Sequence, residues 1–214
     1  MSLKIIFMGT PKFSLKTLEL IHKSDYKIIS VYSQPAKKKS RGLKVVSSPV
    51  QNLAQKLGLI IRTPDKLDKE YNYFKKVKPD VVVVVAYGKI LPKNIISIPG
   101  ILFLNVHASL LPKFRGASPI ARAILNLERE TGISIMKIVE KLDAGPYMRQ
   151  VKVPITSNMT SGDLETKLSD LGAQTLLECL KTIENKDHKF IEQNEKDISF
   201  APKIKKEETR INWK

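Results

Sequence analysis

Apolar residues recur along this chain with two alternating periods, one typical of strands and one typical of helices. Residues 3–8 form a short apolar run, and the turn-forming residues Gly9 and Pro11 follow it at once. From Phe13 to Ile21, apolar residues recur at helical spacing. The chain is therefore predicted to open with a strand followed by a helix.

The same alternation continues almost to the end of the chain. We expect further strands over residues 26–33, 59–62, 80–86, 101–106, 133–139 and 148–153, and helices over residues 50–57, 67–77, 119–127 and 161–183. The segment 80–86 contains five consecutive valines, so it is β-branched on both faces, as in a central parallel strand that helices cover on both sides. The pattern predicts an α/β fold with a doubly wound, mostly parallel sheet, whose ligands bind outside the carboxyl ends of the strands.

Length and apolar content fit one principal domain. A chain of 214 residues with 42% hydrophobic residues can bury a single core, which we assign to residues 1–185. Residues 186–214 are charged and weakly periodic, so we expect an extended tail there.

The chain is strongly basic. Its 37 Lys and Arg residues against 21 Asp and Glu residues give a formal charge of +16, enough to attract a polyanion such as nucleic acid. A compositional bias spread over the whole surface would give the same charge, and composition leaves both interpretations open.

Cysteine and hydropathy indicate the compartment. The single Cys179 excludes an intrachain disulfide and lies in a helical pattern, so we expect it to be buried in a reducing compartment. Residues 3–8 are too few for a secretion signal, and no apolar run approaches the roughly 20 residues that span a bilayer. We expect a cytoplasmic protein with no membrane partner.

Common cofactor motifs are absent. The turn at Gly9 lacks the glycine spacing of a dinucleotide site, and no Walker-type pattern occurs, so we expect no nicotinamide or nucleotide cofactor. The three histidines, His22, His107 and His188, are too dispersed to suggest a metal site. We expect no metal.

Polar residues whose side chains could take part in a reaction lie at the end of the strand predicted over residues 101–106. Asn105 and His107 are two residues apart, so on a strand they point the same way. Asp143 lies in a Gly and Pro turn after a strand that could neighbour the His-bearing one. Taken singly, His107 could simply be held by a backbone carbonyl, and Asp143 could simply form a turn. Together the three suggest a site.

These three groups suit acyl transfer to an amine. Asn105 and a protonated His107 could stabilise the oxyanion of a tetrahedral intermediate, while Asp143 favours the charged imidazole and could receive a proton through water. Ser109 lacks the Gly-x-Ser-x-Gly elbow of a nucleophile and is better suited to shaping a loop and contacting a ligand. Direct transfer is therefore expected, without a covalent intermediate.

Two segments in this order resemble the folate-dependent formyltransferase family. They are Asn105-x-His107-x-Ser109-Leu110-Leu111-Pro112 with Arg115-Gly116, and Leu142-Asp143-Ala144-Gly145-Pro146. Within the family, the chain looks like the members that formylate methionyl-tRNA, on motifs that start at Phe7, Gln34, Arg41, Ser48, Val84, Arg115 and Ala201. The likeness covers nearly the whole chain and implies a formyltransferase-type, Rossmann-like fold.

The resemblance also implies an activity and a set of site residues. The formyl group of 10-formyltetrahydrofolate, as co-substrate, would pass to the amino group of methionine on initiator tRNA, in translation initiation. Asn105, His107 and Asp143 match the catalytic trio. The folate-binding residues would be Ser109, Leu110, Leu111 and Pro112, together with the loop residues Tyr87, Gly88, Ile90 and Leu91. That loop could equally be a plain connection between a strand and a helix.

Two further features concern tRNA. Residues 34–48 match a loop that inserts at the tRNA acceptor stem in the family, and its basic residues suit RNA phosphates; they are Lys37, Lys38, Lys39, Arg41 and Lys44. A solvated charge run is the alternative. The chain ends at a point that resembles the start of a C-terminal β-barrel domain in the family, so we expect that domain to be missing, from a truncated or partial chain, and tRNA affinity to be reduced. We expect a monomer.

Two other functions remain open at this stage. The chain could be a folate-dependent formyltransferase of a small amine, such as a nucleotide precursor or an amino sugar, although the basic loop and residues 115–120 argue against it. It could also be a catalytically inactive RNA-binding module, although the presence of Asn105, His107 and Asp143 argues against that.

Overall fold

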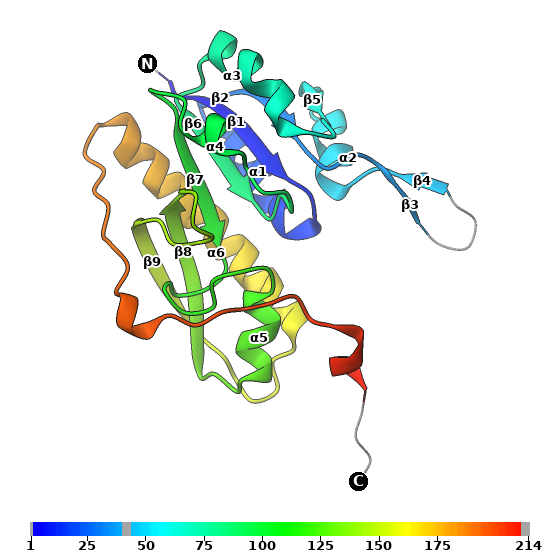
Figure 1. Ribbon diagram of the computed structural model, residues 1–214, viewed down its shortest axis with the longest axis vertical. Coiled ribbons are helices and arrows are strands. Elements are labelled where there is room, and N and C mark those ends of the chain that lie inside the picture. The colour runs from blue at the N-terminus through cyan, green and yellow to red at the C-terminus, as the bar shows by residue number, and fades with distance from the viewer. Residues whose placement is uncertain (1, 40–43, 211–214) are drawn as a thin grey trace.

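A seven-stranded sheet forms the centre of the protein, as a computed structural model describes it for residues 2–39 and 44–210 (Figure 1). The strand order is β5-β2-β1-β6-β7-β8-β9. The strands of this sheet are β1 (Lys4–Gly9), β2 (Lys27–Tyr32), β5 (Ile61–Arg62), β6 (Val81–Val85), β7 (Leu102–His107), β8 (Glu130–Lys137) and β9 (Tyr147–Pro154).

The first five strands of this order pair in parallel, and the last two join the sheet through antiparallel pairs because β8 is reversed. β1 pairs in parallel with β2 and β6, β2 with β5, and β6 with β7, whereas β8 runs antiparallel to both β7 and β9. All five residues of β6 are buried because this strand is the middle one of the seven, with strands on both sides and helices over both faces. The mostly parallel sheet predicted from the sequence is confirmed.

Helices cover both faces of the sheet. Their bounds, with the 3-10 helices written η, are η1 (Lys12–Ser14), α1 (Leu15–Lys23), α2 (Pro49–Lys56), η2 (Leu67–Glu70), α3 (Tyr71–Val77), α4 (Lys93–Ile96), α5 (Pro119–Leu125), α6 (Ser161–Glu184), η3 (Glu195–Asp197) and η4 (Lys206–Thr209). None of these helices is both long and apolar enough to cross a membrane, over the residues described.

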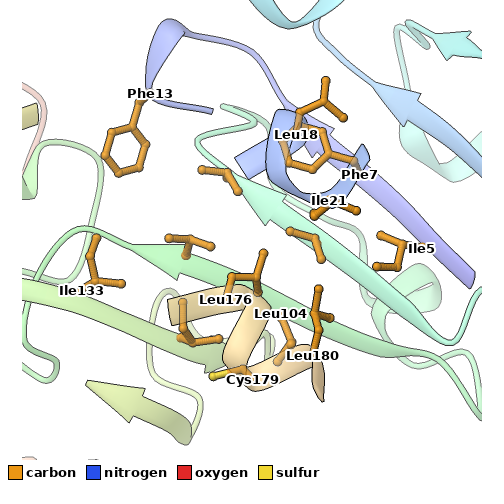
Figure 2. Packing of buried hydrophobic residues seen from close by; sticks show 14 of the residues in the cluster. Ile5, Phe7, Phe13, Leu18, Ile21, Leu104, Ile133, Leu176, Cys179 and Leu180 are labelled. Atoms are coloured by element: carbon orange, nitrogen blue, oxygen red, sulfur yellow. The ribbon is translucent and has the colours of Figure 1, made fainter. Parts of the chain in front are cut away.

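Two apolar layers hold the helices on the sheet. On one face Phe7, Leu104 and Ile133 pack with residues of α1 and α6, among them Leu18 and Leu176 (Figure 2). The other face packs against α3 and α4, through a cluster that contains Ile6, Met8, Val82, Phe103, Phe74 and Ile95. The sheet is therefore doubly wound, as expected. Cys179 is buried in the α6 layer, also as expected.

The structure adds elements that the hydrophobic pattern did not predict. A hairpin of β3 (Lys37–Lys39) and β4 (Lys44–Val46) extends away from the main sheet, where a flexible loop was expected (Figure 1). Its strands carry mostly lysine and therefore give no apolar alternation. β8 begins at Glu130 rather than near residue 133, because cross-strand pairing with β9 continues through its polar start.

The segment after α6 returns to the sheet. Ile191 bridges Tyr147 of β9, and Phe200 bridges Arg115 in parallel. Ala201 is completely buried. Residues 191–201 therefore run along the loops that follow β7 and β8.

Candidate active site

Asn105 and His107 share one face of β7. Their strand neighbours Leu104 and Val106 point into the layer under α6, so the two polar side chains point to the opposite face, with Phe103. His107 is only 5% exposed, and Asn105 is half-buried. The side-chain amide of Asn105 makes no hydrogen bond to another described residue, so it is available to a ligand.

The two ring nitrogens of His107 have different partners. Nε2 lies 2.9 Å from the carbonyl oxygen of Phe114. A carbonyl only accepts hydrogen bonds, so Nε2 carries the proton and donates. Nδ1 lies 3.8 Å from Oδ2 of Asp143. Nδ1 is therefore the nitrogen that remains for proton exchange.

Asp143 reaches His107 from the turn between β8 and β9. β8 runs antiparallel to β7 and ends at Lys137, opposite Leu104, so the turn after β8 must double back along β7 to bring Asp143 to His107. The backbone N–H of Gly116 donates to Oδ2 of Asp143 at 2.8 Å. The φ angle of Asp143 is 47°, in the left-handed region that non-glycine residues rarely adopt, so surrounding contacts must hold this turn.

Residues 109–112 form a loop fastened to β8 and β9. Ser109 is fully buried, and its hydroxyl donates to the carbonyl of Lys113 at 2.6 Å. Ser134 donates to the carbonyl of Ser109 and accepts from the N–H of Leu111, and Gln150 donates to the carbonyl of Leu111 at 2.7 Å. Ser109 therefore shapes the loop. Ser134 and Gln150 carried no sequence signal beyond strand alternation.

A cleft lies beside this loop. Its volume is about 630 Å³, and Leu110, Pro112 and Phe114 line it together with residues of β8 and β9. The volume is in the range of small-molecule sites, but Asn105, His107 and Asp143 do not line this cleft. Of the residues 109–112, Leu110 and Pro112 are the two with side chains on this cleft, whereas Leu111 is buried.

The loop after β6 divides into buried and open residues. Tyr87 is 1% exposed in the core, and burial, helped by the charge of Glu70, raises the pKa of its hydroxyl to about 12. Gly88 has φ 79°, and a Cβ there would collide with the side chain of Gln34. Ile90 is 89% exposed and Leu91 is half-buried. Tyr87 and Gly88 shape the loop, and Ile90 and Leu91 are open to a ligand.

The loops around the trio are in contact. Lys93, which begins α4 after the β6 loop, pairs with Glu140 in the Asp143 turn at 2.7 Å. Leu142 in that turn is 62% exposed. Two loops that present exposed apolar side chains are thus tied together on the face of the sheet that carries Asn105 and His107.

The basic residues expected to bind tRNA fall on the hairpin. Lys37, Lys38 and Lys39 form β3, and Lys44 begins β4. Arg41 lies outside the described residues. Within residues 2–39 and 44–210, no group of three His, Cys, Asp or Glu residues is arranged to hold a metal ion.

Comparison with known proteins gives consistent results. The family model described as formyl transferase matches residues 3–180. The methionyl-tRNA formyltransferase of Pelagibacter ubique is 44% identical over 216 residues, covering 100% of this chain and 70% of that protein. The protein of the same name from Dictyoglomus thermophilum is 44% identical, covering 99% of this chain and 68% of that protein.

Solved structures share the fold at low sequence identity. An N-formyltransferase from Helicobacter canadensis, in complex with folinic acid and dTDP-3-aminofucose, superposes with a TM-score of 0.75 at 23% identity, covering 100% of this chain and 74% of that one. Glycinamide ribonucleotide transformylase 1 from Symbiobacterium toebii gives a TM-score of 0.72 at 17% identity, covering 86% of this chain and 89% of that one. With its whole length matched by relatives of one name and its sheet matched by these structures, the chain belongs to the formyl transferase family, in the group of the methionyl-tRNA formyltransferases.

Proposed function

We propose that the chain transfers the formyl group of 10-formyltetrahydrofolate to the α-amino group of methionyl initiator tRNA. The observation that carries the proposal is the pairing of His107 with Asp143 on the face of β7 that also presents Asn105. The relatives at 44% identity, named for this activity, support the choice of substrate. Such a substrate belongs to translation initiation, so we expect the protein in the cytoplasm.

The proposed chemistry follows from the contacts of the trio. The amine attacks the formyl carbon, and negative charge develops on the formyl oxygen of a tetrahedral intermediate. The intermediate collapses by breaking the bond between the formyl carbon and N10 of the co-substrate, so the amine loses one proton, N10 gains one, and tetrahydrofolate leaves. The unengaged amide of Asn105 donates a hydrogen bond to that oxygen. Nδ1 of His107 exchanges a proton with the reacting groups, because Nε2 is committed to the carbonyl of Phe114. Asp143 stabilises the imidazolium that results.

The co-substrate brings the activated formyl group, and the chain supplies surfaces for it. We assign apolar contacts with the folate to Ile90, Leu91, Leu110 and Pro112, because these side chains are open to a ligand. Tyr87, Gly88, Ser109 and Leu111 would act by shaping the two loops that carry them. No side chain of the trio is a nucleophile of the Ser or Cys type, so the formyl group passes directly to the amine.

For the tRNA, the basic hairpin is the proposed contact. Lys37, Lys38, Lys39, Arg41 and Lys44 lie within eight residues of sequence, and the formal charge of +16 favours an RNA partner. The neighbours that act on sugars and glycinamide ribonucleotide are under 25% identical and support the fold alone. A small-amine substrate is therefore the second choice.

A substrate comparison tests this proposal. The purified chain would be given labelled 10-formyltetrahydrofolate with methionyl initiator tRNA, glycinamide ribonucleotide or a dTDP-linked amino sugar, and uncharged tRNA as the control that lacks the acceptor amine. We expect label on methionyl-tRNA only. Faster transfer to either small amine would contradict the proposal, and so would the absence of transfer to all three acceptors.

A further inference from the structure

Gln193 connects the segment after α6 with the Asp143 turn. It lies beyond residues 3–180, which match the family model, and its side chain is buried at 9% exposure. Its Oε1 accepts from Nε and Nη2 of Arg115, at 3.1 Å and 2.7 Å. Its Nε2 donates to the carbonyls of Asp143 and Gly145, at 2.9 Å and 2.6 Å.

These four contacts allow only one orientation of the amide. A guanidinium only donates and a backbone carbonyl only accepts, so the oxygen must face Arg115 and the nitrogen must face the turn. Arg115 is 2% exposed, and no acidic side chain lies within 4.0 Å of it among residues 2–39 and 44–210. The buried guanidinium therefore depends on Gln193 as a partner, and it fixes the direction in which Gln193 donates.

The Asp143 turn needs such support. Asp143 has a left-handed backbone, and Gly145 lies so close to the carbonyl of Lys137 that a Cβ would collide with it. The two carbonyls that Gln193 binds flank Ala144, so the amide spans the tightest part of the turn. Losing both hydrogen bonds would free the carboxylate of Asp143 to move relative to His107.

The same segment also holds the opposite side of the site. Oγ of Ser199 accepts from the N–H of Phe114 at 2.9 Å, and the carbonyl of Ser199 accepts from the N–H of Arg115 at 2.9 Å. The N–H of Ala201 donates to the carbonyl of Arg115 at 2.7 Å. The carbonyl of Phe114 binds His107, and the N–H of Gly116 binds Asp143. Residues 193–201 thus fasten the loop that orients both groups.

We propose that Gln193, held by Arg115, is a positioning residue for formyl transfer that keeps the Asp143 carboxylate facing Nδ1 of His107. The inference rests on the proposed function, because it acts through the same trio. It extends the active site into a segment with no periodic pattern in the sequence. Gln193 is assigned no contact with either substrate.

The primary test is Gln193→Met, which keeps the length of the side chain and removes its hydrogen bonds. We expect kcat to fall about 10- to 100-fold, while KM for each substrate changes by no more than about twofold. Glu192→Gln is the matched control, since Glu192 is the exposed neighbour and should retain full turnover. Gln193→Glu is the second variant, because it keeps an acceptor for Arg115 but cannot donate to the turn. We expect kcat to fall in it as well.

A double-mutant cycle separates positioning from general destabilisation. In an Asp143→Asn background, Gln193→Met should lower kcat by no more than about a further twofold, because its effect passes through Asp143. An equal loss in both backgrounds would overturn the inference. Full turnover of a folded Gln193→Glu protein would also overturn it, even if Gln193→Met failed to fold. Full turnover of Asp143→Asn would also overturn the inference, because Asp143 would then have no catalytic role to be positioned for. Failure of the unsubstituted chain to formylate methionyl-tRNA would instead contradict the proposed function.

Discussion

At the scale of single residues, the contact that makes His107 look structural also fits the catalytic role proposed for it. The carbonyl of Phe114 holds Nε2, as in a buried histidine with no function, and the same hydrogen bond fixes the tautomer that presents Nδ1 to Asp143. Asn105 is the complementary case, because its side-chain amide has no partner among the described residues. The protein orients His107, whereas the amide of Asn105 is the group that we propose donates to the substrate.

Replacing Asn105 by Ala should slow the chemical step. The variant loses the amide that would donate to the formyl oxygen, so we expect kcat to fall roughly 10²- to 10³-fold with little change in KM. Steady-state formylation of methionyl-tRNA would measure it. Asn52→Ala, which removes an exposed amide on α2, is the control. A variant whose KM rises while kcat stays constant would show that Asn105 only binds substrate.

At the scale of elements, the sequence predicted those strands and helices that have a periodic pattern of apolar residues. The apolar run of residues 80–86 predicted the central strand β6, and the next apolar run predicted the strand that ends in Asn105 and His107. The structure pairs these two strands, as β6 and β7. Gln193, Ser134 and Gln150 could not be predicted, because their roles depend on carbonyls that only the folded loops bring together. The β3–β4 hairpin was missed because the sequence of its strands is mostly lysine and shows no apolar alternation.

A charged cluster joins three elements near the β5 edge of the sheet, on the face that also carries Asn105 and His107. Tyr32 of β2 and Arg62 of β5 both donate to Oε2 of Glu70 in η2, each at 2.6 Å. Burial disfavours the charged form of Glu70, but these hydrogen bonds and the charge of Arg62 outweigh it and hold the pKa below the ordinary value of 4.5. The folded protein therefore stabilises the charged carboxylate of Glu70 more than its protonated form.

Because of this cluster, we expect part of the free energy of unfolding to be lost in acid. Because the folded-state pKa of Glu70 is lowered, its contribution is present above pH 4.5 and is lost as the pH falls through the folded-state value. Urea unfolding of the wild type and of Glu70→Gln would measure it. The difference in free energy of unfolding should be largest at neutral pH and shrink in acid. A difference that did not vary with pH would contradict this interpretation.

At the scale of the whole molecule, the site lies where the parallel sheet gives way to antiparallel strands. β7 provides Asn105 and His107, the return from β8 provides Asp143, and the segment after α6 closes over the loop between them. Parallel strands create an edge at which polar residues gather, and the antiparallel hairpin brings a carboxylate back over that edge. Proteins of the same fold carry names for different acceptors, so the sheet supports the transfer and leaves the choice of acceptor to other parts.

Rapid-quench formylation tests the central claim most directly, that Asn105, His107 and Asp143 catalyse direct transfer. With excess protein, labelled 10-formyltetrahydrofolate and methionyl-tRNA, label should pass to the tRNA without appearing on the protein. His107→Ala should slow this single turnover by roughly 10²- to 10⁴-fold. Label bound covalently to the protein during turnover, or an unchanged rate in His107→Ala, would contradict the account.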